Sequence, residues 1–144
     1  MGRSAGDPIE VLLVDDQPAI LAGVGALIGS EAPFLHLAGS AGCGRDALEL
    51  ALHLQPDIIV LDVELGGEDG LALIPRLRAC CHAVIVLFST LTGAERRLRA
   101  LPPDIAAFFV SKGGEGQELI DAIRCAAARA DGKGRGADSG VFRA

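Results

Sequence analysis

Acidic residues follow two apolar segments of the sequence at the points where those segments end. Asp15 and Asp16 follow the run IEVLLV at 9–14, and Asp62 ends the run DIIVLD at 57–62. Carboxylates held close together repel one another, and a hard divalent cation such as Mg²⁺ relieves that repulsion through oxygen ligands. Beside such a cation, one carboxylate can act as a nucleophile toward phosphorus.

Two further apolar segments end in residues that can bind an anion. The run AVIVLFS ends at Ser89 and is followed by Thr90, and the run IAAFFVSK ends at Lys112. Phosphoryl transfer depends on positioning and on neutralising the charge of the equatorial oxygens. A metal ion, an ammonium group and a hydroxyl donor supply these contacts. Each residue alone is common at the end of a strand, so the indication comes from their joint occurrence.

The order of the predicted elements explains how these residues could meet. Short apolar strands alternate with helical patterns five times: strands at 9–14, 34–40, 57–62, 83–89 and 105–112, helices at 18–28, 44–54, 71–80, 93–101 and 116–130. Such alternation predicts an α/β fold with a parallel sheet covered on both faces. We expect a flavodoxin-like, doubly wound (βα)5 arrangement with strand order 2-1-3-4-5, in which ligands bind at the carboxyl ends of the strands.

Composition limits the classes of function. The 144 residues are 50% hydrophobic, enough for one domain, which we place at 8–130, with 131–144 as a flexible Gly-rich tail or the start of a linker. The net charge of −6 argues against direct nucleic-acid binding by this chain. No apolar run reaches the length of a membrane helix, and no signal peptide is apparent, so we expect a cytoplasmic protein that does not bind membranes.

The motifs resemble those of the receiver domain of bacterial two-component response regulators, over about residues 9–130. LLVDDQP at 12–18 is similar to the family's acid-pair motif, and LDVELGGEDG at 61–70 resembles its phosphorylation loop. The resemblance implies that Asp62 is the phospho-acceptor, with Lys112 and Ser89 as catalytic partners, Ser89 also being the hydroxyl of the switch. VLFS and FFVSK carry this part of the match, and FFVSK places Phe109 at the aromatic switch position. The details are closest to the LuxR/FixJ-type group.

The resemblance also implies a cofactor and a partner. Mg²⁺ would be held directly by Asp16, Asp62 and the backbone carbonyl of Glu64, with Asp15 acting mainly through water. Asp62 would take its phosphoryl group from a sensor histidine kinase or a phosphotransfer protein. Ser89 and Lys112 would then move onto the phosphate, so that the domain controls an output. The chain would catalyse only its own phosphorylation and dephosphorylation, and a homodimer is possible.

The sequence departs from the family pattern at several positions. Gly66 stands where Pro is usual, which suggests a looser loop, and Thr90 stands where a small residue is usual, which suggests narrower access to Asp62. Ile105-Ala106 replaces the usual Gly-Ala and follows Pro102-Pro103, so the usual signalling face is in doubt. LuxR-type members also carry a DNA-binding helix-turn-helix, whereas only VFRA follows the Gly-rich tail. The sequence is therefore either a lone receiver or a piece of a longer regulator.

Two other functions compete with a phospho-accepting module. A degenerate receiver would serve only as a protein-binding scaffold, but the expected site residues are all present. An Asp-nucleophile phosphatase of the haloacid dehalogenase type would carry a D-x-D motif. Here Glu64 stands two residues after Asp62, and the adjacent pair Asp15-Asp16 lacks that spacing.

Overall fold

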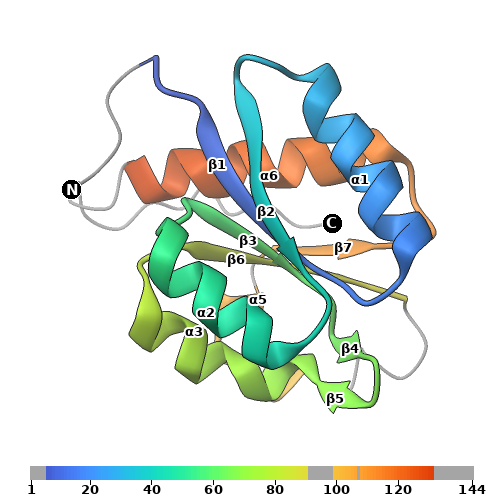
Figure 1. Ribbon diagram of the computed structural model, residues 1–144, viewed down its shortest axis with the longest axis vertical. Coiled ribbons are helices and arrows are strands. Elements are labelled where there is room, and N and C mark those ends of the chain that lie inside the picture. Colours follow the sequence, from blue (N-terminus) through green and yellow to red (C-terminus); the bar gives the residue numbers. More distant parts are fainter. Residues whose placement is uncertain (1–5, 91–98, 107, 132–144) are drawn as a thin grey trace.

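The computed structural model describes residues 6–90, 99–106 and 108–131, and its centre is a five-stranded parallel sheet (Figure 1). Its strands lie in the order β2-β1-β3-β6-β7 and all neighbouring pairs are parallel. The bounds are β1 Ile9–Val14, β2 Leu35–Ala41, β3 Ile58–Leu61, β6 Val84–Ser89 and β7 Phe109–Ser111. Counted within this sheet the order is 2-1-3-4-5, which confirms the flavodoxin-like, doubly wound fold.

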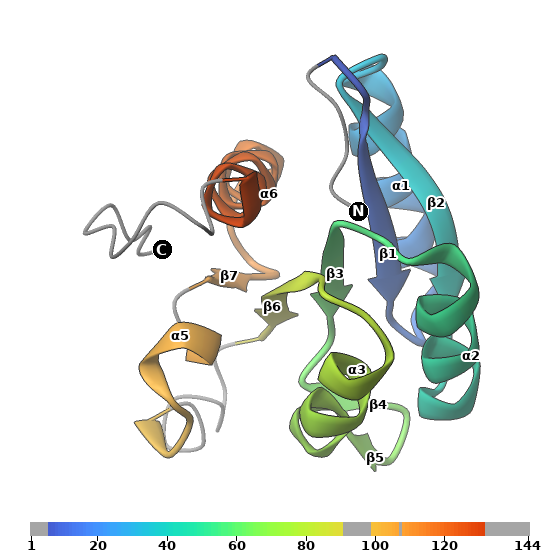
Figure 2. The same ribbon diagram turned by 90° about the vertical axis from the view of Figure 1, so that its left-hand side faces the viewer.

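Helices cover both faces of the sheet, which explains why its central strand β3 is apolar and buried along its whole length (Figures 1 and 2). Val11 and Leu13 of β1 belong to a core cluster on the side of α1 (Pro18–Ser30) and α6 (Gly116–Asp131). Leu12 and Val14 belong to a second cluster, on the side of α2 (Gly44–Leu54) and α3 (Ile74–Cys80). Consecutive side chains of a strand point to opposite faces, so both sets are buried.

Proline marks the start of two helices: α1 begins at Pro18 as predicted, whereas α3 begins at Ile74, three residues after the predicted start. Pro18 lies in the first turn of α1, and Pro75 lies in the first turn of α3, after the 3-10 turn η1 (Gly70–Leu73). At the other end of α2, Gln55 adopts a left-handed conformation with φ 48°. Its side-chain amide donates hydrogen bonds to Leu52 O at 2.9 Å and Cys80 O at 2.9 Å, which joins α2 to the end of α3.

Two local features differ from the sequence-based prediction. A hairpin of β4 (Glu64–Leu65) and β5 (Glu68–Asp69) follows β3 and was not predicted, because its strands are too short to show a period. The strand predicted from residue 105 is wrong at its start: 103–106 form a helical turn, α5 (Pro103–Ala106), and β7 begins at Phe109. Proline is well suited to a first helical turn, and it initiates this one.

Other predictions fall on parts of the chain that the structure does not describe. Most of the helix predicted at 93–101 lies within 91–98, and nearly all of the predicted tail lies within 132–144, both outside the described residues. Among the residues that are described, no helix is both long and apolar enough to span a membrane.

Candidate functional site

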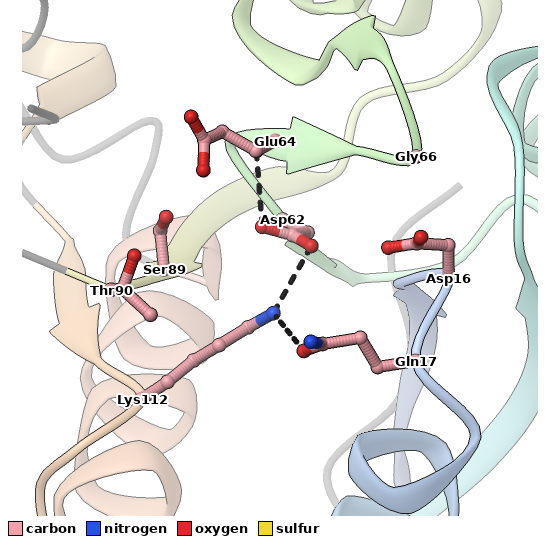
Figure 3. Close-up of a pocket in the computed structure, with 8 residues that line it drawn as sticks. All are labelled: Asp16, Gln17, Asp62, Glu64, Gly66, Ser89, Thr90 and Lys112. Atoms are coloured by element: carbon pink, nitrogen blue, oxygen red, sulfur yellow. Dashed lines mark hydrogen bonds and ion pairs between the residues drawn. The ribbon is translucent and has the colours of Figure 1, made fainter. Parts of the chain in front are cut away.

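The carboxyl ends of β1, β3, β6 and β7 meet at one pocket (Figure 3). Its lining combines acidic, amide, hydroxyl and ammonium side chains: Asp16, Gln17, Asp62, Glu64, Gly66, Ser89, Thr90 and Lys112. Asp15 lies next to this lining and is fully buried. The residues that the sequence predicts at strand ends are therefore brought together at the edge of the sheet that parallel α/β folds use for ligands.

Three carboxylates form the acidic part of the pocket. Asp15, Asp16 and Asp62 each contribute an oxygen atom, and these atoms all lie within 4.8 Å of one another. Asp62 is 3% exposed and Asp15 is 0% exposed, whereas Asp16 faces solvent. An all-oxygen donor set with one solvent-facing member fits a hard divalent cation that keeps part of its water shell.

The ammonium group of Lys112 lies at the centre of the polar contacts (Figure 3). Its Nζ is 2.8 Å from Asp15 Oδ2 and 3.0 Å from Asp62 Oδ2, and it donates a hydrogen bond to Gln17 Oε1 at 3.1 Å. An ammonium group has three N–H donors, and Lys112 uses two of them in hydrogen bonds to Gln17 and Asp62, beside its ion pair with Asp15. Lys112 therefore has two anionic partners, Asp62 and Asp15.

Burial and charge act in opposite directions on the two groups of this pair. Burial raises the pKa of Asp62 above 3.8, and hydrogen bonds from Lys112 and from the Glu64 N–H only partly oppose this rise. Burial lowers the pKa of Lys112, but its bonds to Asp15 and Asp62 outweigh burial and hold that pKa above 10.5. Lys112 is therefore a cation at neutral pH, while Asp62 takes up a proton more readily than an exposed aspartate does.

The backbone after β3 fixes the carboxylate of Asp62. Its Oδ1 accepts a hydrogen bond from the Glu64 N–H at 3.0 Å, and its own N–H donates to Val14 O at 2.9 Å. Gly70 passes so close that a Cβ atom there would lie 2.0 Å from the carbonyl oxygen of Asp62. Only glycine permits this approach, so Gly70 sets the path of the chain around Asp62.

The turn of the β4–β5 hairpin lies against the acidic cluster. Gly66 and Gly67 have φ of 51° and 89°, and a Cβ atom at Gly66 would lie 3.0 Å from Asp16 Oδ2. Proline, the usual residue of the resembled family at this position, has φ near −65° and cannot adopt this conformation. The departure at Gly66 therefore belongs to a defined hairpin turn with positive φ.

Ser89, Thr90 and Phe109 differ in their relation to the pocket. Ser89 is 2% exposed and Thr90 is exposed, and both line the pocket. Phe109 is outside the lining: it is half-buried in β7 and packs against the core cluster on the side of α2 and α3. The structure thus brings Ser89 to Asp62 and Lys112, and separates Phe109 from them.

Gln17 is a pocket residue that the sequence analysis did not identify. It stands between the acid pair and Pro18, and its own N–H donates to Asp15 Oδ1 at 2.9 Å. An amide after a strand is not a signal by itself. Gln17 directly follows two carboxylates at the carboxyl end of a strand, where the fold predicts ligand binding. That position is the signal that could have identified it as a pocket residue.

Comparisons with known proteins agree with this geometry. A family model for the response regulator receiver domain matches residues 11–124. This chain belongs to that family. Receiver domains are phospho-accepting modules of two-component signal transduction and interact with histidine kinases or phosphotransfer proteins, and they bind Mg²⁺ at an acidic pocket of this kind. Receiver domains serve in non-enzymatic regulators, and some homologues, such as the CheB methylesterase, are enzymes through other domains.

The similar proteins are of two types. The chain is 36% identical over 123 residues to the nitrate/nitrite response regulator protein NarL of Escherichia coli, covering 85% of this chain and 56% of NarL. It is 33% identical over 128 residues to protein-glutamate methylesterase/protein-glutamine glutaminase 1 of Syntrophomonas wolfei, covering 82% of this chain and 36% of that protein. It therefore spans less than two thirds of either relative.

A solved structure shows the same fold. The response regulator domain of Thermotoga maritima CheB superposes with a TM-score of 0.73 at 27% identity, covering 84% of this chain and 97% of that one. The receiver architecture thus extends over most of the residues described here.

Proposed function

We propose that Asp62 is the phosphoryl acceptor of this receiver and that its donor is a phosphohistidine on a sensor histidine kinase or a phosphotransfer protein. An Asp62 carboxylate oxygen forms the bond to phosphorus while the phosphorus–nitrogen bond of the donor breaks, and the bonding electron pair stays on the imidazole. The supporting observation is the placement of Asp62 in the pocket, between the Lys112 ammonium and the Glu64 N–H.

The acidic cluster supports Mg²⁺ as the cofactor. Asp16, Asp62 and the backbone carbonyl of Glu64 would hold the ion, with Asp15 acting mainly through water and through Lys112. The bound ion would neutralise charge on the phosphoryl oxygens during transfer. Asp16 is suited to this role because its carboxylate is open to solvent and lies beside the Gly66 turn, whereas Asp15 is already paired with Lys112.

Phosphorylation would supply new acceptors, and Lys112 and Ser89, which line the same pocket, would bind them. The phosphoryl oxygens would compete with the carboxylates for the Lys112 ammonium, and Ser89 would donate its hydroxyl. Hydrogen bonds to charged groups contribute about 1.5–3 kcal/mol each. Near-complete switching requires a free-energy difference of about 5.5 kcal/mol, which two or three such contacts can supply. Phe109 in β7, three residues before Lys112, would report the change to the rest of the domain.

Intact mass after incubation with phosphoramidate and Mg²⁺ tests the proposal. We expect one phosphoryl adduct on the wild-type chain and none on Asp62→Asn, whose amide is similar in shape but not nucleophilic. Asp121→Asn is the matched control, because Asp121 is an exposed residue of α6 bonded to Gln117. It should react like the wild type.

The same experiment separates the alternatives. Continuous turnover of the donor without a lasting adduct would favour a phosphatase, and the absence of any reaction would favour a degenerate scaffold. Adduct formation on Asp62→Asn at the wild-type rate would contradict the assignment of the acceptor.

A further inference from the structure

Gln17 completes the coordination of the lysine that faces Asp62. Its Oε1 accepts a hydrogen bond from Lys112 Nζ at 3.1 Å, Asp62 Oδ2 accepts another at 3.0 Å, and Asp15 Oδ2 forms an ion pair with Nζ at 2.8 Å. Because an ammonium group can only donate, the amide oxygen of Gln17 must be the atom that faces it. Figure 3 shows the two side chains reaching each other across the pocket, Gln17 from the position just before α1 and Lys112 from the position just after β7.

The backbone holds Gln17 where its side chain can make this contact. Pro18 restricts the preceding residue to extended conformations, and Gln17 has φ −92° and ψ 115°. Its N–H donates to Asp15 Oδ1 at 2.9 Å, and its carbonyl accepts from the Leu21 N–H at 3.0 Å. The side chain of Gln17 does not cap α1, so its contact in the described part of the chain is the one with Lys112.

We propose that Gln17 is a positioning residue for phosphoryl transfer. It holds the Lys112 ammonium beside Asp62 when phosphorylation removes the negative charge of that carboxylate. This inference rests on the proposed function of Asp62. When Asp62 becomes an acyl phosphate, Lys112 keeps its ion pair with Asp15 and its hydrogen bond to Gln17, and another N–H turns to a phosphoryl oxygen. Without Gln17 the ammonium keeps only the ion pair with Asp15, which does not fix its orientation.

A double-mutant cycle distinguishes action through Lys112 from a merely structural role. The rate of adduct formation with phosphoramidate and Mg²⁺ is measured for the wild type, Gln17→Leu, Lys112→Met and the double variant. We expect Gln17→Leu to slow the wild type by about threefold to tenfold. The same change should have no further effect in the Lys112→Met background, because the residue it positions is gone.

Gln117→Leu is the matched control, since Gln117 makes an exposed amide contact with Asp121 on α6, and it should react at the wild-type rate. A second measurement does not depend on Lys112→Met being folded or active. The NMR signals of the Lys112 side chain should show greater mobility in Gln17→Leu than in the wild type or in Gln117→Leu.

The outcomes are distinguishable. If the wild type forms no adduct at Asp62, the proposed function itself is wrong. If the wild type reacts but Gln17→Leu slows the Lys112→Met background by the same factor, or leaves the Lys112 signals unchanged, then Gln17 does not position the lysine.

Discussion

At the scale of single residues, the site is a balance between one cation and three anions. Lys112 is 9% exposed in its side chain and bridges two carboxylates that are almost fully buried. Such a pair contributes modestly while intact, but removing one partner leaves buried charge uncompensated. The stability of the metal-free domain should therefore depend on Lys112 more than on an ion pair at its surface.

Lys112→Met should destabilise the metal-free protein by about 3 kcal/mol at neutral pH. The free energy of unfolding in urea measures this. Without its cation, Asp62 has a folded-state pKa raised further above 3.8, so the folded state binds more protons than the unfolded state. Stability of the variant should then rise as pH falls through that raised pKa, so its deficit should shrink on acidification from neutral pH.

Arg78→Met provides the control for this experiment. Arg78 lies 3.4 Å from Asp104 and both side chains are about half exposed, so its removal should cost less than about 1 kcal/mol. A deficit for Lys112→Met that equals the control, or that grows on acidification, would show that the buried pair is not a significant contributor.

Asp16→Ala should remove the thermal stabilisation that Mg²⁺ gives to the domain. Asp16 is the solvent-facing member of the cluster, and it faces two buried carboxylates without a cation of its own nearby in the described structure. Its loss should therefore raise the melting temperature in the absence of metal while lowering Mg²⁺ affinity. Thermal melts with and without Mg²⁺ measure both effects. Asp121→Ala should keep the full metal-induced shift, and an equally large shift in Asp16→Ala would reject the metal site.

At the scale of elements, the site depends on the segment that follows β3. The hairpin of β4 and β5 closes next to Asp16, and η1 returns the chain past Asp62. Glu68 of β5 also accepts the Gly44 N–H with both carboxylate oxygens, at 3.1 and 3.3 Å, at the first residue of α2. An anion at a helix N-terminus is favourable, so the loop that follows Asp62 is tied to α2 as well as to β3.

Gly70→Ala should disturb Asp62 without changing any side chain of the pocket. The added Cβ atom would lie 2.0 Å from the Asp62 carbonyl oxygen, so the backbone must shift, at a cost of about 1–3 kcal/mol. We expect lower stability and slower adduct formation. Gly29→Ala in α1 meets nothing within 4 Å and should stabilise the domain by up to about 1 kcal/mol. Equal behaviour of the two variants would mean that Gly70 does not position Asp62.

The sequence predicts helices and strands well where long segments show an apolar run or a regular spacing of apolar residues. It predicts poorly the features that depend on a few residues or on one tertiary contact. The strands delivering Asp15, Asp62, Ser89 and Lys112 were predictable because each is a buried apolar run ending in a polar residue. The hairpin after Asp62 and the Pro103–Ala106 turn are too short for periodicity. The Gln17–Lys112 contact joins residues 95 positions apart, so only the folded chain reveals it.

At the scale of the whole molecule, strand β7 runs from the pocket to the core cluster on the side of α2 and α3. Lys112 and Phe109 lie on or directly after β7, but Lys112 faces Asp62 whereas Phe109 packs toward α2 and α3. We therefore propose that a change in the position of Lys112 would be transmitted along β7 to the core cluster that Phe109 contacts. Longer relatives such as NarL have further chain beyond the matched region, on which a receiver could act.

The signal of Phe109 should report this coupling. With beryllofluoride as a phosphoryl mimic and Mg²⁺, we expect the NMR resonances of Phe109 to shift in the wild type. Lys112→Met should lose most of that shift, because a charged contact that differs between the two states is gone. Ser89→Ala should lose less, since only a neutral hydroxyl is removed. A full wild-type shift in Lys112→Met would show that Lys112 does not link the pocket to β7.

The most direct test of the account identifies the residue that carries the phosphoryl group. The chain is phosphorylated with phosphoramidate and Mg²⁺, treated with borohydride, which reduces an acyl phosphate of aspartate to homoserine, and mapped by peptide mass spectrometry. The account predicts homoserine at position 62 alone, and none when Mg²⁺ or the donor is omitted. Homoserine at position 15 or 16, or an adduct that leaves Asp62 unmodified, would contradict it.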